Sequence, residues 1–149
     1  MIVDAQTRLS DAQALAASGN STNVIDLSLM TPQRDIGVGE TIEFNFQVDV
    51  AADLASGDET YQFEIIQSTT SGLAAPDTLN QVAIARATLV AGFTFVMKVP
   101  EALVTKQFIA VHYTLGGTTP SITITCDVLS EQLSHLAKPQ TYAKGYTIS

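Results

Sequence analysis

The residues best suited to chemistry in this chain of 149 residues are two histidines, one cysteine and a short run of acidic residues. His112 lies among aromatic residues in an alternating stretch, which predicts a packed or hydrogen-bonded structural histidine. His135 has no second His or Cys at the spacing of a metal site. We therefore expect no zinc site and no resident cofactor.

Cys126 is the only cysteine, so the chain can form no internal disulfide. It falls on the apolar side of an alternating run, together with Ile122, Ile124 and Val128. A reactive thiol needs an accessible, electropositive environment, and no basic residue stands near it in the sequence. The pattern predicts a buried cysteine that acts as a small apolar residue.

The densest group of acidic residues comprises Asp49, Asp53, Asp58 and Glu59. These carboxylates offer oxygen ligands for a calcium ion, but they lack the regular spacing and fixed glycine of an EF-hand, which favours a solvated loop. Gly37 and Gly39 begin a dinucleotide-binding pattern, but Ile42 stands where its last glycine belongs. No Gly-x-Ser-x-Gly motif surrounds a serine nucleophile. The sequence therefore predicts no catalytic residue and no enzymatic activity.

The stretch Thr41–Val50, TIEFNFQVDV, organises the predicted fold. Its apolar residues alternate strictly with polar ones, which is the pattern of a half-buried β-strand. Burial of alternate residues alone does not offset the entropy of ordering a strand, so neighbouring strands and a second layer are required. The residues expected on its buried face are Ile42, Phe44, Phe46, Val48 and Val50.

Similar alternation predicts further strands, separated by polar loops such as 51–59 and 70–80. The stretch 107–115 is apolar on both faces, so it belongs at the centre of a sheet or under a partner. Gly116 and Gly117 are expected to close a hairpin between this strand and the next. The predicted strands cover residues 22–29, 41–50, 61–69, 82–89, 93–99, 107–115 and 121–129.

Near the N-terminus, Ser10 and Gln13 have the spacing of a capping box, and Ala and Leu follow. This predicts a short helix over roughly 11–17 that ends at Gly19. We therefore expect a single all-β domain over 1–149, with an N-terminal arm (about 1–19) and a C-terminal tail (about 130–149). The expected fold is a jelly-roll-like antiparallel β-sandwich of about seven to eight strands.

The charge balance argues against a nucleic-acid partner. Seven Lys and Arg face fifteen Asp and Glu, giving a net charge of −8, and the cations are scattered, whereas phosphate backbones are bound by clustered cations. No apolar run approaches the roughly 20 residues that span a bilayer, and no signal-peptide pattern opens the chain. We expect a protein that is made in a cytoplasm and binds neither nucleic acid nor membrane. Charged residues make up only 15%, against roughly 25% on average, which favours a surface covered by partners.

Several short segments resemble one known family, in order along almost the whole chain. The opening MIVDAQ with LSDAQA, and the closing YAKGYTI, are the most distinctive. They are similar to the capsid cement (head decoration) proteins of tailed bacteriophages, of the Bordetella-phage cement type. Where those proteins tend to carry Asp before the final Gly-aromatic pair, this chain has Lys144. The other matching segments are STN with IDL (21–27), RDIG with GE (34–40) and YTLGG (113–117).

This resemblance implies a non-enzymatic jelly-roll domain on the outer surface of the virion, assembled in the host cytoplasm. There it bridges major capsid protein subunits of an HK97-type lattice and stabilises the expanded shell against DNA pressure. It implies a homo-oligomer, with a dimer favoured over a trimer. The candidate capsid or oligomer contact residues are Met1, Ile2, Val3, Asp4, Ala5, Gln6, Arg34, Asp35, Tyr142, Lys144, Tyr146 and Ile148.

Two other functional classes stay open. A carbohydrate- or receptor-binding β-sandwich of a phage tail or fibre would need exposed aromatic side chains. Trp is absent and most Phe fall in the apolar phase, which leaves the four tyrosines, Tyr61, Tyr113, Tyr142 and Tyr146. A small jelly-roll enzyme would need clustered histidines for a metal, and the two histidines are far apart in the sequence.

Overall fold

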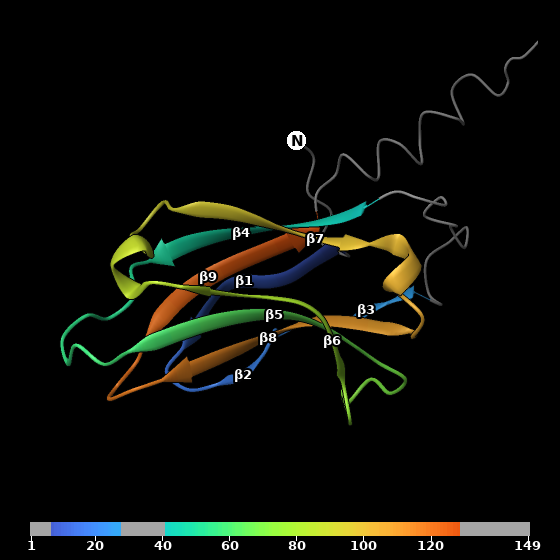
Figure 1. Ribbon diagram of the computed structural model, residues 1–149, viewed down its shortest axis with the longest axis horizontal. Helices are drawn as coiled ribbons and strands as arrows, with labels where there is room; N and C mark the ends of the chain where they lie inside the picture. Colours follow the sequence, from blue (N-terminus) through green and yellow to red (C-terminus); the bar gives the residue numbers. More distant parts are fainter. Residues whose placement is uncertain (1–6, 28–40, 129–149) are drawn as a thin grey trace, which may run out of the picture.

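The computed structural model describes residues 7–27 and 41–128, which form two β-sheets packed face to face (Figure 1). No helix among these residues is long and apolar enough to cross a membrane. The strands are β1 (Arg8–Leu15), β2 (Gly19–Asn20), β3 (Ile25–Asp26), β4 (Thr41–Val50), β5 (Thr60–Ser68), β6 (Asp77–Ile84), β7 (Thr94–Pro100), β8 (Phe108–Gly116) and β9 (Ile122–Val128). Two 3-10 helices, η3 (Arg86–Thr88) and η4 (Glu101–Leu103), precede and follow β7.

The strand order is that of a jelly roll. The first sheet has the order β1-β9-β4-β7 and the second the order β2-β8-β5-β6, with every pairing antiparallel. The short strand β3 also pairs with β8, one step along from β2, so β2 and β3 act as two pieces of one edge strand. Counted in this way, four strands face four, as in a double Greek key. The predicted all-β sandwich is confirmed.

The core is centred on aromatic rings contributed by both sheets. Phe46 of β4 stacks on Phe95 of β7 at 4.7 Å between ring centroids, and Phe63 of β5 meets Phe95 edge-on at 5.0 Å. Phe63 also contacts the ring of Tyr113 in β8 at 6.0 Å. Such offset and edge-to-face contacts add about 0.5–1.5 kcal/mol each beyond the area buried. The two layers are therefore joined by specific packing as well as by apolar burial.

Most of the predicted strands are confirmed. β4 has the predicted bounds, and its inward residues Ile42 to Val48 are buried. β8 lies inside its sheet between β5 and the β2–β3 edge, as its two apolar faces predicted. On its outer face Phe108 and Ala110 belong to a second, smaller apolar cluster with Ile66 and Leu73.

The predicted helix over 11–17 is wrong, because these residues belong mostly to β1, which pairs with β9. The register shifts twice along β1, between Arg8 and Ser10 and again before Gln13. Each β-bulge breaks the two-residue alternation that identifies a strand. The spacing of Ser10 and Gln13 does reflect an interaction, since the Ser10 hydroxyl donates to Gln13 Oε1 at 2.7 Å, but across a bulge and not at a helix cap.

Three further expectations are corrected. β8 and β9 form no hairpin, because they lie in different sheets and Gly116–Gly117 begin a connection that crosses the sandwich. The loop expected over 70–80 is shorter, since β6 begins at Asp77 and ends at Ile84, where η3 follows. The strand expected over 22–29 is paired only at Ile25–Asp26 among the described residues.

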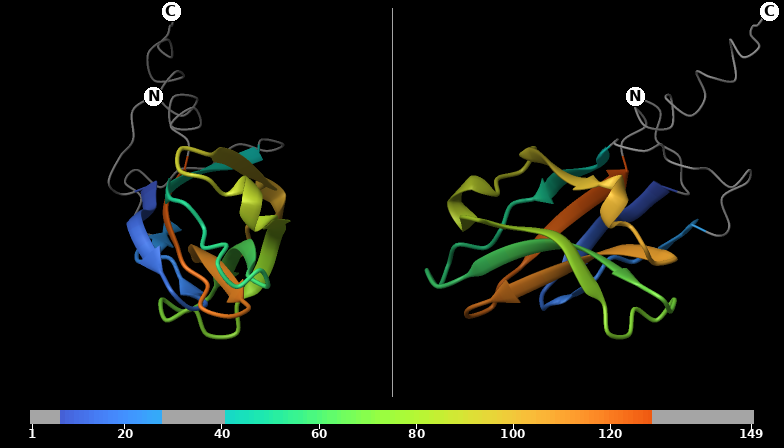
Figure 2. Two further views of the ribbon diagram at one scale, coloured as in Figure 1. Left: turned by 90° about the vertical axis from the view of Figure 1, so that its left-hand side faces the viewer. Right: turned by 45° about the vertical axis from the view of Figure 1, so that its right-hand side comes forward.

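The four points where the described ranges begin or end lie at the same end of the sandwich (Figures 1 and 2). At this end Arg8 pairs with Asp127, Phe44 pairs with Val128, and the N–H of Leu27 donates to Gln107 O at 3.0 Å. The chain therefore leaves the described sandwich at this end toward each of the predicted contact segments. All twelve predicted contact residues lie outside the described residues.

Candidate functional site

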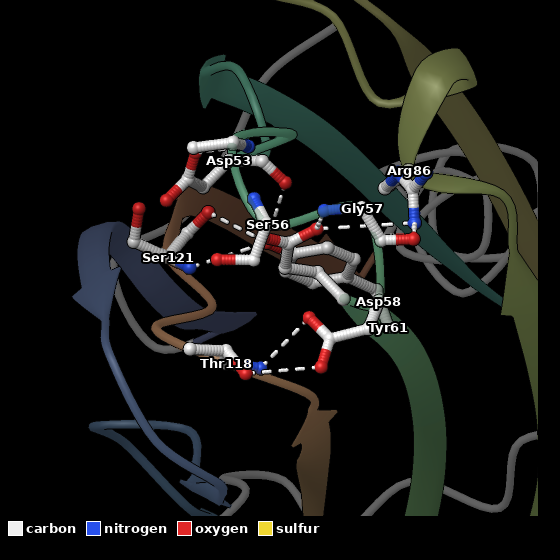
Figure 3. A network of polar contacts seen from close by, with 10 residues as sticks. Asp53, Ser56, Gly57, Asp58, Tyr61, Arg86, Thr118 and Ser121 are labelled. Atoms are coloured by element: carbon white, nitrogen blue, oxygen red, sulfur yellow. Dashed lines mark hydrogen bonds and ion pairs between the residues drawn. The ribbon is translucent and has the colours of Figure 1, made fainter.

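Three of the loops at the opposite end of the sandwich are joined by polar contacts, and we call them the loop end. They connect β4 to β5 (residues 51–59), β6 to β7 (85–93) and β8 to β9 (117–121). Polar side chains from all three loops form one network there (Figure 3). A charged or hydrogen-bonded side chain holds each loop, so the loop end has a defined shape.

Glu59 is the buried anchor of the first loop. Its carboxylate accepts the backbone N–H of Ser56 at 2.8 Å and that of Gly57 at 3.0 Å, and the residue is only 3% exposed. Arg86 from η3 lies 3.8 Å from this carboxylate and donates to Gly57 O (Figure 3). Because a buried carboxylate is costly without donors, these contacts explain why Glu59 is tolerated in the interior.

The hydroxyl of Tyr61 joins the first loop to the third. It shares its one proton between the carbonyl oxygens of Ser121 at 3.1 Å and Asp53 at 3.3 Å, and it accepts the N–H of Ser121 at 3.1 Å. The N–H of Asp53 donates to the same Ser121 carbonyl at 2.9 Å. The ring of Tyr61 is buried in the core, so a core residue fixes the relative positions of both loops.

Asp58 holds the third loop from the surface side. Its carboxylate accepts the backbone N–H and the hydroxyl of Thr118, each at 3.0 Å. These hydrogen bonds lower the pKa of Asp58, with the backbone donor the larger cause. Gly117, at φ +89°, packs so closely that a Cβ there would lie 2.5 Å from Asp58 O. A glycine is required at this position both by its backbone angle and by this contact.

The loop end also exposes apolar side chains. A bulge in β4 shifts the register between Val48 and Val50, so that Val50 pairs with Thr123 and is 59% exposed. The expectation that Val50 lies on the buried face is therefore wrong. Burial of a side chain of this kind would stabilise the fold by about 1.5–3 kcal/mol, and the exposed Val50 does not make this contribution. Leu54 and Val90, at 50% and 53% exposed, lie in the adjoining loops, and we call the three residues the Val50 patch.

Backbone hydrogen bonds place Val90 beside Val50, and Leu54 follows in the loop after β4. The N–H of Val48 donates to Phe93 O at 2.9 Å and that of Ala52 to Leu89 O at 2.9 Å, on either side of Val50. The segment 89–93 therefore continues the ladder of β4 past the end of β7. Val90 is next to the residue that pairs with Ala52, and it lies beside Val50 along this ladder.

The acidic group predicted to line a solvated loop is divided in the structure. Asp49 accepts the hydroxyl of Thr125 at 2.6 Å, Asp53 accepts the N–H of Ala55 at 2.9 Å, and Asp58 binds Thr118. Glu59 is buried, which contradicts the expectation of a solvated loop at that residue. No three or more His, Cys, Asp or Glu side chains among the described residues are grouped as a metal site would require.

His112 is a hydrogen-bonded strand residue, as predicted. Its Nδ1 lies 2.6 Å from Oδ1 of Asn20, with which it is paired across β2 and β8. On its other side in the sheet it faces Glu64 of β5. His135 lies outside the described residues.

Cys126 is fully buried, also as predicted, on the inner face of β9. Burial raises the pKa of its thiol well above the usual value, with Asp127 a smaller cause. A thiol without access to solvent and with a raised pKa is a poor nucleophile. The residue therefore contributes packing and no chemistry.

The tyrosines considered as a sugar-stacking platform are not available among the described residues. Tyr61 and Tyr113 are both buried, at 1% and 0% exposed, and their hydroxyls are hydrogen-bonded inside the protein. A stacking platform needs an exposed ring face, so neither can serve. Tyr142 and Tyr146 lie outside the described residues.

The family model described as Bbp16 matches residues 9–126, more than half of the chain. The chain belongs to the Bbp16 family. Bbp16 is a Bordetella phage protein family, so the chain is phage-related, and the resemblance noted from the sequence is confirmed at this level. The match runs from β1 to β9 and so spans both sheets and the loop end. No curated protein matches the chain.

Proposed function

We propose that this protein is a capsid cement, or decoration, protein that binds the outside of a phage head. The observation that carries the proposal is membership of the Bbp16 phage family, whose model matches residues 9–126. In this role it is a structural protein and not an enzyme. It bridges major capsid protein subunits and stabilises the expanded shell against the pressure of packaged DNA.

The arrangement of the chain supports this role. The candidate contact residues lie in the ranges 1–6, 28–40 and 129–149, and these ranges connect to β1, β3, β4 and β9 at one end of the sandwich (Figure 1). A rigid β-domain whose candidate contact ranges all connect at a single end is suited to hold neighbouring subunits together. We propose that these segments contact the shell or a second copy, and that the protein acts as a dimer.

The charges of the described residues support a protein partner over nucleic acid. Every Lys and Arg among them, namely Arg8, Arg86, Lys98 and Lys106, forms an ion pair with an Asp or Glu. Phosphate backbones are bound by cations that are free to replace counterions. An acidic protein on the outer surface of the virion would not compete with the shell for DNA.

The energetics of cementing are simple. A protein that binds the expanded lattice and not its precursor stabilises the expanded state by mass action, once for each copy bound. Many moderate contacts resist internal pressure because subunits joined by several links must separate in concert.

Cryo-EM of heads from the phage that carries this gene, with and without the gene, tests the proposal. Density of a two-sheet sandwich on the outer shell, lost on deletion and restored by added protein, is the expected result. Identical shells in both preparations would overturn the cement function. In that case a glycan-binding assay on the purified protein would test the tail or fibre alternative.

A further inference from the structure

We propose that the Val50 patch is a second contact surface, which docks on an apolar area rimmed by Lys and Arg on the capsid shell protein. This inference rests on the proposed cement function and extends it. Its residues are described residues of the loop end, and none of them is among the predicted contact residues. Its own observations are the bulge, the loop network and the charges around the patch.

The bulge in β4 gives the patch its first argument. Ile42 to Val48 point into the core in strict alternation, and the extra residue at Asp49 turns the next apolar side chain outward. Bulges are frequent where a strand re-aims a side chain for a function. Three of the five exposed large apolar side chains of the described residues lie at this one end, namely Val50, Leu54 and Val90.

The rigidity of the loop end gives a second argument. Glu59, Tyr61 and Asp58 fix the loops that carry Leu54 and Val90 by hydrogen bonds already made in the free protein. A surface that is ordered before binding loses little conformational entropy on docking. Because these hydrogen bonds fix the backbone of the loops, they also fix the shape of this surface.

The charges decide what kind of partner fits. Asp49 and Asp53 directly precede Val50 and Leu54 in the chain, and Asp58 lies in the same loop as Leu54. Arg86, the cation that the described residues place at the loop end, is already paired with Glu59. A second copy docking through the same surface would bring two acidic rims together, which is repulsive. A partner with an apolar centre and a basic rim is complementary in both respects.

The position of the patch adds a consequence for bridging. β4 begins at Thr41, at the end of the sandwich where the described ranges begin and end, and it finishes at Val50 at the loop end. Its ten residues separate the two ends by about 30 Å, at a rise of about 3.3 Å per residue. A protein held at both ends lies with its long axis along the shell. Contacts at both ends then let one copy join two places on the shell about this far apart.

Binding to heads purified from a phage lacking the gene tests this inference. The patch variant carries Val50→Ser and Val90→Ser, both at exposed positions, and matched controls carry Val96→Ser or Leu103→Ser, which remove exposed apolar side chains elsewhere. Melting temperature verifies that all variants fold. We expect the patch variant to bind about tenfold more weakly or worse, as truncated interface anchors do, with both controls like wild type. Wild-type binding should also weaken as salt is raised.

The outcomes separate the inference from the function. If wild type and all variants bind equally, the patch is not a contact and the inference is overturned, while the cement function stands. If wild type itself fails to bind heads, the cement function is overturned, and the inference with it. If the patch variant binds heads normally but loses self-association in sedimentation velocity, the occupant is a second copy and the proposed shell contact is wrong.

Discussion

Thr118 donates both its backbone N–H and its hydroxyl to the carboxylate of Asp58, each at 3.0 Å. The two residues are distant in sequence and belong to loops at the same end of the jelly roll. This pair joins the loop after β4 to the loop after β8 from the solvent side. Because the accepting group is a titratable carboxylate, the joint is sensitive to pH.

We expect acid to weaken this joint. Asp58 has a pKa below its usual value of 3.8 in the folded protein, so the carboxylate contributes stability above that value and loses it as the pH falls through the folded pKa. Asp58→Asn should lower the melting temperature at neutral pH, and its difference from wild type should shrink below about pH 4. Asp77→Asn, which removes a carboxylate from an exposed ion pair, is the control. A difference that does not vary with pH would show that the charge of Asp58 is unimportant.

Glu59 should contribute more than a surface carboxylate. Glu59→Gln leaves one of the two N–H donors of Ser56 and Gly57 without an acceptor and removes the partner of Arg86. Hydrogen bonds to charged groups contribute about 1.5–3 kcal/mol, so we expect a loss of this size in the free energy of unfolding by urea. Glu43→Gln breaks a pair whose Lys98 side chain is 60% exposed, and it should cost about 0–1 kcal/mol. Equal costs for the two variants would contradict the anchoring role of Glu59.

The buried hydroxyls of Ser10 and Tyr113 predict an asymmetry. They lie 2.7 Å apart, and since the Ser10 proton is donated to Gln13, Tyr113 is the donor to Ser10. Tyr113→Phe removes one hydrogen bond and should cost about 0.5–1.5 kcal/mol. Ser10→Ala leaves the buried hydroxyl of Tyr113 without a partner and should cost about 1–3 kcal/mol. Urea unfolding of both variants and of the double variant measures the coupling. A larger cost for Tyr113→Phe would reverse this assignment of donor and acceptor.

Tyr113 and Cys126 together predict sensitivity to alkali. Burial raises the pKa of each well above its usual value, 10.0 for Tyr and 9.0 for Cys. Their neutral forms therefore stabilise the fold fully below those values, and this contribution is lost as the pH rises beyond them. We expect the melting temperature to fall above about pH 9 and a thiol reagent to modify Cys126 only on unfolding. Rapid modification in the native protein at neutral pH would show that Cys126 is accessible.

The residue pattern predicts the faces of the strands but not their neighbours. Alternation identified the buried residues of β4 and the burial of Cys126, because side-chain direction follows directly from strand geometry. It could not predict that β8 and β9 lie in different sheets, since the tight turn suggested by Gly116 and Gly117 serves a hairpin and a crossover equally well. Strand pairing depends on packing between residues distant in sequence.

Bulges account for two further errors, one of which lies at the candidate site. The two bulges of β1 interrupt its alternation, so the sequence predicted a helix there. The bulge of β4 turns Val50 to the exposed face, where the alternation had predicted a buried residue. The sequence did not predict the burial of Glu59, because its partners are brought to it by the folded loop and by Arg86, which is distant in sequence. A carboxylate two to three residues after Ser56–Gly57 was the one local signal of that turn. The loop end could therefore not be predicted from alternation, because its residues depart from regular strand geometry.

Removal of Met1–Gln6 tests the proposed N-terminal contact. The described sandwich begins at Thr7, and β1 pairs with β9 from Arg8 onward, so we expect the truncated protein to keep the wild-type melting temperature. Its occupancy on heads lacking the native protein should fall, because a proposed contact is lost.

Combining this deletion with Val50→Ser and Val90→Ser makes the test quantitative. If the two ends make independent contacts, their free energies add, and the loss of affinity of the combined variant is the product of the two separate losses. Normal occupancy of the deletion variant would remove the N-terminal arm from the interface. A combined loss no greater than that of the patch variant would show that the arm and the patch do not act as separate contacts on the shell.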